Sequence, residues 1–593
     1  MRGGMRRISA LAAVLALSMG MGTACTKKNK EGEAKSGDAA KTTAVQSGPS
    51  NKQLTIGMTQ EFESMNPLIM TMAASSYVFG MVGRPLMVID TKWNWQCELC
   101  TEVPTIENGL AKIVEEGGKK KLAVTWKLKE GMAWGDGKPV TGEDFRLAWE
   151  IGKSPNVSVG SKETYERIEA LTVDAKNPLI FVTKFKEPRY DYYQLSMNPI
   201  PAHLEGPVWA KTKDQTGAYE KQTIYNKDPL NKGLYNGPYT VNELKLGSHV
   251  VVAKNPKWAG KEAAIEKIIL KLIPNTQALE AGILSGTIDM ISELGMTFDQ
   301  AIAFDERVTA DASTKGKYVT HFRDGLVYEH IDLNLRNPIL KDVNVRQALV
   351  YAIDRDKLSM ALFKGKQKKA VSNIHPLDPY FSDDVKKYPY DPAKASAMLE
   401  AAGWKKGADG IRAKDGKKLE LTLMTTANNK TRELVQVFLQ EEWKKVGAKI
   451  SIKNEPARVY FGETVRKAKY EAMAMYAWIS SPDAPPRGTL HSSEIPTKEN
   501  GYSGQNSCGW ANAKVDKLLE DVFLEFDFDK RKKMMAEIQK EYTTDVPVIP
   551  LYLRAQIATV PGNMNGFELS GHLFYSSLNV EKWSFTDVAA KTH

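Results

Sequence analysis

"LELTLMTTANNKTRELVQVFLQEEWKKVGAKISI", residues 419–452, places a strand, a helix and a second strand in succession. The apolar residues of 419–424 and 448–452 follow the pattern of strands. Between them, five apolar residues fall at the spacing of one buried helix face: Leu434, Val435, Phe438, Leu439 and Val446. Gly447 then supplies a helix stop signal. The spacing predicts a parallel strand pair with a right-handed helical crossover, and open α/β sheets bind ligands at the carboxyl ends of their strands.

A second amphipathic segment precedes this unit. In DVNVRQALVYAIDRDKL, residues 342–358, one helix face is formed by Val345, Ala348, Leu349, Ala352 and Ile353. Asp342 or Asn344 can cap its start, and Arg355 and Lys357 suit its negative end. We expect Asp354 and Arg355 to serve in capping and ion pairing rather than in substrate binding.

Capping residues delimit two further helices. Asp391 has the pattern of an N-cap, Pro392 of the first helical residue and Gly403 of the stop. Thr141, three residues before an aspartate, forms a weak capping box that opens a helix from Phe145.

The N-terminal segment has the layout of a secretory signal peptide. Three arginines precede an apolar run of ten residues, 8–17, which is shorter than the roughly 20 residues of a spanning helix. Small residues and Cys25 follow, and this ending resembles a bacterial lipobox, with Gly22 in place of the usual leucine. We expect residues 1–25 to be a lipoprotein signal peptide with Cys25 lipidated; an ordinary signal peptide with a chance cysteine is the alternative. Residues 26–50 contain almost no large apolar side chains, which predicts a flexible tether.

Length and charge limit the remaining possibilities. Removing 50 of the 593 residues leaves 543, enough for two to four lobes. The formal charge of +10 falls to about +7 when the three signal arginines are removed. No stripe of basic residues alternates with aromatics, so a nucleic-acid partner is not expected.

Three cysteines follow Cys25. Cys97 and Cys100 have the spacing of a redox motif, and Cys508 stands alone. An oxidising compartment permits one disulfide and leaves one thiol. A structural bridge, to Cys508 or within the pair, is favoured over a catalytic pair, because no thioredoxin-like pattern surrounds the motif.

Two longer segments carry a family resemblance. VTWKLKEGMAWGDGKPVTGEDF, residues 124–145, joins a strand to an aromatic residue, an Asp-Gly turn, a proline and an acidic helix start. ILKDVNVRQALVYAIDRDKL, residues 339–358, ends in Ala-Ile-Asp-Arg. Both resemble signatures of extracellular solute-binding proteins of the peptide/nickel type, family 5. Further matches occur in the family's order: NGPYTVNELKLGSHVVVAKNPKWAG, ALEAGILSGTIDMI, YDPAKASAMLEAAGW and DVPVIPLYLR. The resemblance is specific for the family and much less so for the ligand.

The resemblance implies the α/β fold of periplasmic binding proteins, with two α/β lobes joined by two hinge strands and an inserted subdomain. By analogy, the first lobe comprises residues 51–83, 236–325 and 556–593, the inserted subdomain 84–235, and the second lobe 326–555. The crossings between the lobes are expected near residues 324–328 and 553–556.

Peptide binders of this family hold an extended ligand largely through its backbone. Many use an aspartate three residues after a tryptophan to bind the ligand's α-amine. Trp478 and Pro485 match that segment here, but Ser481 stands at the aspartate position and Asp483 lies two residues later. Either Asp483 reaches the amine or the ligand carries no such amine.

Other candidate ligand contacts are aromatic or basic. We expect Trp510, Trp134 and Tyr77 to line the cleft, with core packing as the alternative for each tryptophan. Arg487 could pair with a ligand carboxylate, although a solvated surface arginine is the more ordinary role.

No catalytic constellation, phosphate loop or paired-histidine metal motif is present in the sequence, so neither an enzyme nor a cofactor or resident metal is expected. The resemblance implies a monomeric, lipid-anchored receptor of the cell envelope, periplasmic or on an outer face. It would capture a peptide-like solute and deliver it to an ABC permease and ATPase. The alternatives are a binder of an oligosaccharide, opine-like compound or metal chelate, a redox protein acting through Cys97 and Cys100, and a surface lipoprotein without a transport role.

Overall fold

The unit at 419–452 forms a parallel strand pair with a connecting helix, as predicted. In the computed structural model of the protein, β16 (Glu420–Met424) and β17 (Lys449–Ile452) pair in parallel, and α12 (Lys430–Lys445) connects them. One residue of the predicted helix face is wrong: Leu434 is exposed, because the buried side of α12 is formed by Val435, Leu439 and their neighbours.

The structure describes residues 49–586 except 63, 71, 160–161, 428, 457–458, 466, 500–501, 503 and 573. The predicted signal peptide, Cys25 and nearly all of the predicted tether therefore lie outside the described residues. Among the described helices, none has the length and apolar character needed to cross a bilayer.

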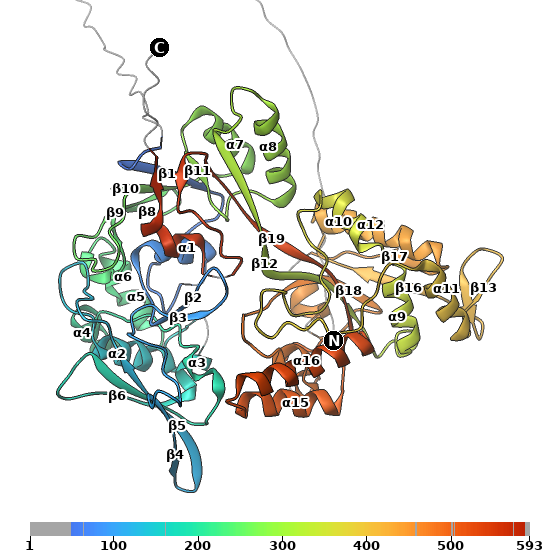
Figure 1. Cartoon of the computed structure of the whole chain (residues 1–593), viewed down its shortest axis with the longest axis horizontal. Coiled ribbons are helices and arrows are strands. Elements are labelled where there is room, and N and C mark those ends of the chain that lie inside the picture. Colours follow the sequence, from blue (N-terminus) through green and yellow to red (C-terminus); the bar gives the residue numbers. More distant parts are fainter. Residues whose placement is uncertain are drawn as a thin grey trace, which may run out of the picture. The chain divides into compact units, whose positions relative to one another are not determined.

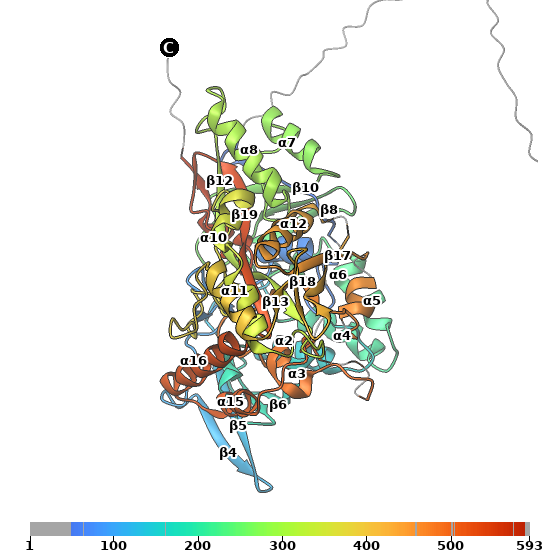
Figure 2. The same ribbon diagram turned by 90° about the vertical axis from the view of Figure 1, so that its right-hand side faces the viewer.

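A ten-stranded mixed sheet runs through the protein in the order β17-β16-β18-β12-β19-β11-β1-β10-β9-β8. Its remaining strands are β1 (Gln53–Met58), β8 (Tyr239–Lys245), β9 (His249–Lys254), β10 (Lys267–Leu272), β11 (Met290–Ile291), β12 (Tyr318–Leu333), β18 (Met473–Ile479) and β19 (Val548–Pro561). In Figures 1 and 2, β12 and β19 lie side by side and connect the part with β1 to the part with β16–β18.

A separate four-stranded antiparallel sheet forms within the predicted inserted subdomain, in the order β4-β5-β7-β6. Its strands are β4 (Ala111–Glu116), β5 (Lys119–Lys127), β6 (Ile168–Val173) and β7 (Ile180–Phe185). The smaller pairings join β2 (Met87–Ile89) to β3 (Trp95–Cys97), β13 (Lys405–Lys406) to β14 (Arg412–Lys414) and β15 (Lys417–Lys418), and β20 (Met564–Asn565) to β21 (Ser584–Phe585).

Helices flank these sheets. Before residue 326 they are α1 (Ala73–Val82), α2 (Gly142–Lys153), α3 (Glu163–Arg167), α4 (Ala202–Thr212), α5 (Ala218–Gln222), α6 (Ile224–Lys227), α7 (Thr276–Ser285) and α8 (Phe298–Ala310). After it they are α9 (Val343–Tyr351), α10 (Arg355–Phe363), α11 (Pro392–Ala401), α12, α14 (Arg487–Leu490), α15 (Ala513–Leu524) and α16 (Phe528–Asp545).

Local capping chemistry sets several of these ends. The box of Thr141 and Asp144 opens α2 at Gly142, three residues earlier than predicted. The Asp391 side chain accepts a hydrogen bond from the Lys394 backbone N–H and starts α11, as predicted.

The predicted single helix over 342–358 is interrupted. Asp342 caps α9, which ends at Tyr351, and the Asp354 side chain accepts from the Lys357 N–H to start α10. Arg355 is correspondingly buried, and its guanidinium donates to backbone carbonyls, including those of Ala370 and Pro550, instead of forming a surface ion pair.

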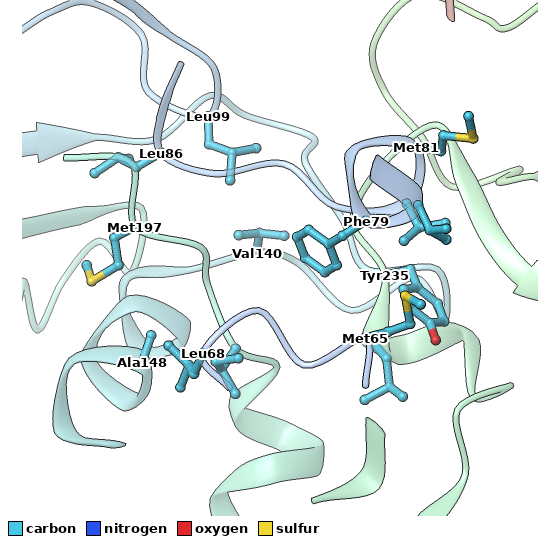
Figure 3. Close-up of a cluster of buried hydrophobic side chains, with 14 of the residues drawn as sticks. Met65, Leu68, Phe79, Met81, Leu86, Leu99, Val140, Ala148, Met197 and Tyr235 are labelled. Atoms are coloured by element: carbon cyan, nitrogen blue, oxygen red, sulfur yellow. The ribbon is translucent and has the colours of Figure 1, made fainter. Parts of the chain in front are cut away.

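The hydrophobic core is divided unequally. The largest cluster packs β1, α1 and β8–β10 together with the four-stranded sheet. Figure 3 shows Phe79 and Met81 of α1 in one cluster with Val140, Ala148 and Met197. A second cluster lies under β16–β18 and α9–α12, and a third around α15 and α16. The residues of the two predicted lobes therefore belong mainly to separate clusters, while most of the predicted inserted subdomain shares the cluster of the first predicted lobe.

Cys97 and Cys100 form a disulfide, and Cys508 is buried and unpaired. The bridge thus lies within the pair and does not involve Cys508.

Helix α12 allows a direct test of this packing. We expect Leu439→Ala to destabilise the protein by about 2–5 kcal/mol, because Leu439 is fully buried in the second cluster. Leu434→Ala on the same helix removes the same atoms from an exposed site, where about 0.5 kcal/mol or less is expected. Urea unfolding of both variants measures the difference, and equal losses would contradict the placement of this helix.

Candidate functional site: an interlobe cleft

A cleft of about 910 Å3 lies beside β12 and β19. Its lining comes from five stretches of chain, within 293–299, 325–329, 426–432, 552–557 and 571–575, and from Gln60 and Gln367. The stretches include the residues that follow the carboxyl end of β16, the start of α12 and the loop after β11. Both predicted lobes therefore contribute to one cleft.

An interruption of the β12–β19 ladder forms part of the cleft wall. Asp324 pairs with Ala555 and Tyr328 with Leu553, so three residues of β12, 325–327, face the single residue Arg554. Such a bulge bends a strand and redirects its side chains. It lies within the stretches where the crossings between the lobes are expected.

Charged side chains occupy this wall. The carboxylate Oε1 of Glu329 accepts hydrogen bonds from Arg432 Nη2 at 3.0 Å and Nε at 3.3 Å, and both residues are buried. Arg432 also donates to Thr426 Oγ1 at 3.1 Å. The guanidinium of Arg554 is half-exposed, with its Nη1 3.7 Å from Glu329 Oε1. Glu329 therefore neutralises the buried Arg432, while the guanidinium of Arg554 donates no hydrogen bond to any described residue.

Glu293 lies on the first-lobe side of the cleft. Its Oε1 accepts the backbone N–H of Ser576 at 2.9 Å, and burial raises the pKa of its carboxyl. Tyr77 lies close to it and is fully buried; burial, and then the charge of Glu293, raise the pKa of Tyr77 well above its ordinary value. The ring of Tyr77 contacts Tyr575, which lines the cleft. Tyr77 thus lies one layer behind the wall.

His572 is a further lining residue. Its Nδ1 accepts the backbone N–H of Phe574 at 3.1 Å, which leaves Nε2 to donate to the carbonyl of Asp90 at 2.9 Å. Burial lowers its pKa to about 4, so the ring is neutral at pH 7. Both ring nitrogens are occupied. Among the described residues, no three His, Cys, Asp or Glu side chains lie close enough to hold a metal ion.

Trp478 is half-buried on β18 and lines a second pocket of about 430 Å3. The rings of Phe461, Tyr476 and Tyr502 share this pocket. Tyr476 packs edge-on against both Trp478 at 5.8 Å and Phe461 at 6.0 Å between ring centroids. The arrangement offers apolar and aromatic contact.

Ser481 and Asp483 follow this strand with different environments. Ser481 is exposed, whereas Asp483 is only 5% exposed. The Asp483 carboxylate accepts hydrogen bonds from Tyr193 and, at 2.9 Å, from Gln194, both in the predicted inserted subdomain. Asp483 is therefore engaged within the protein.

The remaining predicted contacts lie in other surroundings. Trp134 is buried in the largest core cluster and donates to Asp144 Oδ2 at 3.3 Å. Trp510 is buried in the third cluster and donates to Asp545 Oδ2 at 2.9 Å. Arg487 pairs with Glu494. None of the seven predicted side chains is among the described residues that line the larger cleft, so their role in ligand binding stays a prediction.

Sequence reasoning missed Glu329, Arg432, Arg554, Glu293 and His572. A weak signal for Glu329 existed: it is a charged residue in a strand predicted to cross between the lobes, and such groups are buried only with a partner. Arg432, three residues past the N-cap of α12, lies near the carboxyl end of β16, where α/β sheets place ligands. Nothing local identifies Arg554, because its position depends on the long-range β12–β19 register.

Comparison with known proteins gives a consistent result. The sequence model of the bacterial extracellular solute-binding proteins, family 5 (middle region), matches residues 105–495. The oligopeptide-binding protein AppA of Bacillus subtilis strain 168 is 28% identical over 539 residues, covering 89% of this chain and 91% of that protein.

Solved structures agree in fold. The oligopeptide-binding protein of Thermus thermophilus, complexed with a pentapeptide, has a TM-score of 0.65 at 28% identity, covering 90% of this chain and 96% of that one. NikA of Brucella suis, complexed with Fe(III)-EDTA, has a TM-score of 0.72 at 20% identity, covering 90% and 100%. The predicted fold class is thereby confirmed.

Removing the negative charge of Glu329 tests the charged wall. We expect Glu329→Gln to cost about 3 kcal/mol of stability, because Arg432 would stay buried without its counter-charge. The double variant Glu329→Gln/Arg432→Met removes both charges and should recover most of that loss, as measured by denaturant unfolding. If the double variant instead loses as much unfolding free energy as Glu329→Gln and Arg432→Met lose in sum, the two side chains are not coupled.

Proposed function

Because the chain belongs to the bacterial extracellular solute-binding proteins of family 5, we propose that it captures peptide-like solutes for an ABC importer. Family membership makes it a binding protein and not an enzyme. The peptide class is supported by the two relatives at 28% identity, one named as an oligopeptide-binding protein and the other solved with a pentapeptide. Delivery to a membrane permease and its ATPase completes the proposed role.

We assign residues 51–83, 236–325 and 556–593 to the first lobe, 84–235 to the inserted subdomain and 326–555 to the second lobe. The separate four-stranded sheet within 84–235 and the separate cores support this division. The interrupted stretch of the β12–β19 pair serves as the hinge, because no residues of the two strands are paired between Asp324 and Tyr328.

The observation that carries the proposal is the cleft of about 910 Å3 at that interruption, lined from both lobes. Cavities of this size suit small ligands. A solute that contacts both walls binds the closed arrangement more tightly than the open one, and this difference in affinity drives closure.

Within the cleft, Arg554 supplies the guanidinium for a solute carboxylate, since it has no other hydrogen-bond partner among the described residues. The aromatic pocket of Trp478 accepts an apolar side chain of the solute. Tyr77 acts indirectly, by supporting Tyr575 and Glu293.

We further propose that Cys25 is lipidated and that the segment to residue 50 tethers a monomeric binding protein to the outer side of a membrane. The lipobox-like ending and the composition of the segment support this. Metabolic labelling with a fatty acid, lost in Cys25→Ser, is the test.

Mass spectrometry of the small molecules released when the purified protein is denatured tests the solute class directly. Peptides are expected. An oligosaccharide or a metal chelate would replace the peptide assignment, and loss of uptake in Cys97→Ser/Cys100→Ser with solute binding intact would favour a redox role.

Trp478→Ala should weaken binding of the peptide released from the purified protein about 10-fold, because a central aromatic contact of roughly 1.4 kcal/mol is lost. Isothermal titration calorimetry measures the affinity, and the melting temperature checks folding. Tyr390→Ala, at an exposed tyrosine of the same lobe, is the matched control and should leave the affinity unchanged. Unaltered affinity in Trp478→Ala would remove the aromatic pocket from the binding site.

A further inference from the structure

Residues 189–194 of the inserted subdomain make contacts that the proposed function does not use. They include a short helical turn, Tyr190–Tyr193. Tyr190 is 1% exposed and belongs to the third core cluster, together with Tyr380 and residues of α15 and α16. A side chain of the inserted subdomain is thus buried in the core of the second lobe.

Aromatic and cationic groups surround this turn. The guanidinium carbon of Arg531 lies 4.0 Å from the ring centroid of Tyr190, and Phe523 stacks on the same ring at 6.2 Å. Arg189 lies over Phe523 at 4.1 Å. Desolvated contacts between a cation and an aromatic ring contribute up to about 2 kcal/mol each. These contacts therefore stabilise the packing of the turn against the second lobe.

Three polar side chains of the same segment converge on Asp483. The Tyr190 hydroxyl donates to its backbone carbonyl at 2.9 Å. The Gln194 amide donates to that carbonyl at 2.8 Å and to Oδ2 at 2.9 Å, and the Tyr193 hydroxyl also donates to Oδ2. Asp483 has a φ of 55°, a conformation that a non-glycine residue keeps only when its surroundings enforce it.

We propose that residues 189–194 form a clasp that holds the inserted subdomain against the second lobe when no solute is bound. The inference rests on the proposed function in one respect: the clasp affects solute binding only if the lobes close around a solute. While the clasp is engaged, the protein is closed without solute, and Asp483 is covered by the clasp. Further separation of the lobes requires these bonds to break.

Two neighbouring carboxyl groups of the second lobe, those of Asp378 and Asp483, lie beside the clasp. Asp378 Oδ2 accepts the backbone N–H of Asp483 at 3.1 Å, and both side chains are buried. Burial raises the pKa of Asp378 to about 7, with the charge of Asp483 adding to the effect, and burial also raises the pKa of Asp483.

Other titratable or charged groups face this pair from three directions. They are Tyr190 and Tyr193 on the clasp, Tyr380 beside Asp378, and Arg531 on α16, whose positive charge lowers the pKa of Asp483. Asp191 of the clasp is paired with Arg167 and Arg189.

The sign of the pH effect follows from the raised pKa. The folded protein binds a proton at Asp378 that the unfolded chain releases at its ordinary value near 4. The resulting stabilisation is complete below pH 4 and is lost as the pH rises through about 7. Deprotonation of Asp378 adds a negative charge beside Asp483, the residue that the clasp holds, so the clasp should weaken between pH 5 and pH 8.

The double variant Tyr193→Phe/Gln194→Ala tests the clasp, since it removes the bonds to the Asp483 side chain from two half-buried residues without emptying the core. Small-angle scattering of the solute-free protein should show a larger radius of gyration than wild type. Apparent peptide affinity should rise about 3- to 10-fold, because a larger fraction of molecules is open and competent to bind.

Tyr192→Phe is the matched control. It removes a neighbouring hydroxyl that bonds to the carbonyl of Pro104 within the same subdomain, and wild-type scattering is expected. If the solute-free double variant scatters as wild type does, the clasp does not hold the lobes together. This comparison needs no solute, so it tests the clasp alone. The proposed function would be overturned by a different result: no peptide binds the wild type or reduces its radius of gyration.

Raising the pH from 5 to 8 should enlarge the solute-free wild type. Asp378→Asn keeps an oxygen that accepts the Asp483 N–H but has no proton to lose, so its radius of gyration should stay the same at both pH values. Equal pH responses of wild type and Asp378→Asn would overturn the role of Asp378 in the clasp.

Discussion

The antiparallel pairing of β12 with β19 is the constraint on which the rest of the structure depends. It joins the strands around β1 to those around β16 in one continuous sheet, although the two parts have separate cores. Where the ladder is interrupted, a side chain at Gly325 would be crowded: a Cβ there would lie 3.0 Å from the carbonyl oxygen of Arg554 and 3.2 Å from that of Gly571. The connection is therefore strong along its length and weak at one place, which is the property a hinge needs.

The same interruption explains why charge is buried in the cleft. A bulge turns Arg554 towards the cavity, and Glu329, which pairs with Tyr552 in the same ladder, is buried beside it. A buried carboxylate is tolerated only with a partner, and Arg432 at the start of α12 provides two hydrogen bonds to one oxygen. A hydrogen-bonded pair thus lies beside a half-exposed guanidinium that donates no hydrogen bond to a described residue, and this guanidinium is the group available to a solute.

Local features were predictable because local chemistry decides them. Periodicity gave the strand–helix–strand unit at 419–452, and capping residues gave several helix starts, but apolar spacing alone placed Leu434 on the wrong side of its helix. The break at Asp354 was missed, since one side chain can end one helix or begin the next. The cleft could be predicted only in outline: Glu329 and Arg432 are 103 positions apart in sequence and meet only in the folded sheet.

The position of Asp483 links the replacement of the family's aspartate by Ser481 to the opening and closing of the lobes. With Ser481 at the aspartate position, the next carboxylate is Asp483, which is bonded to Tyr193 and Gln194. A solute amine could reach it only by displacing those groups, so binding there would have to open one interlobe contact while closing another. A solute held by Arg554 faces no such competition. The free energy available to drive closure would then come from the charged wall of the cleft, and the clasp would set how often the unliganded cleft is open.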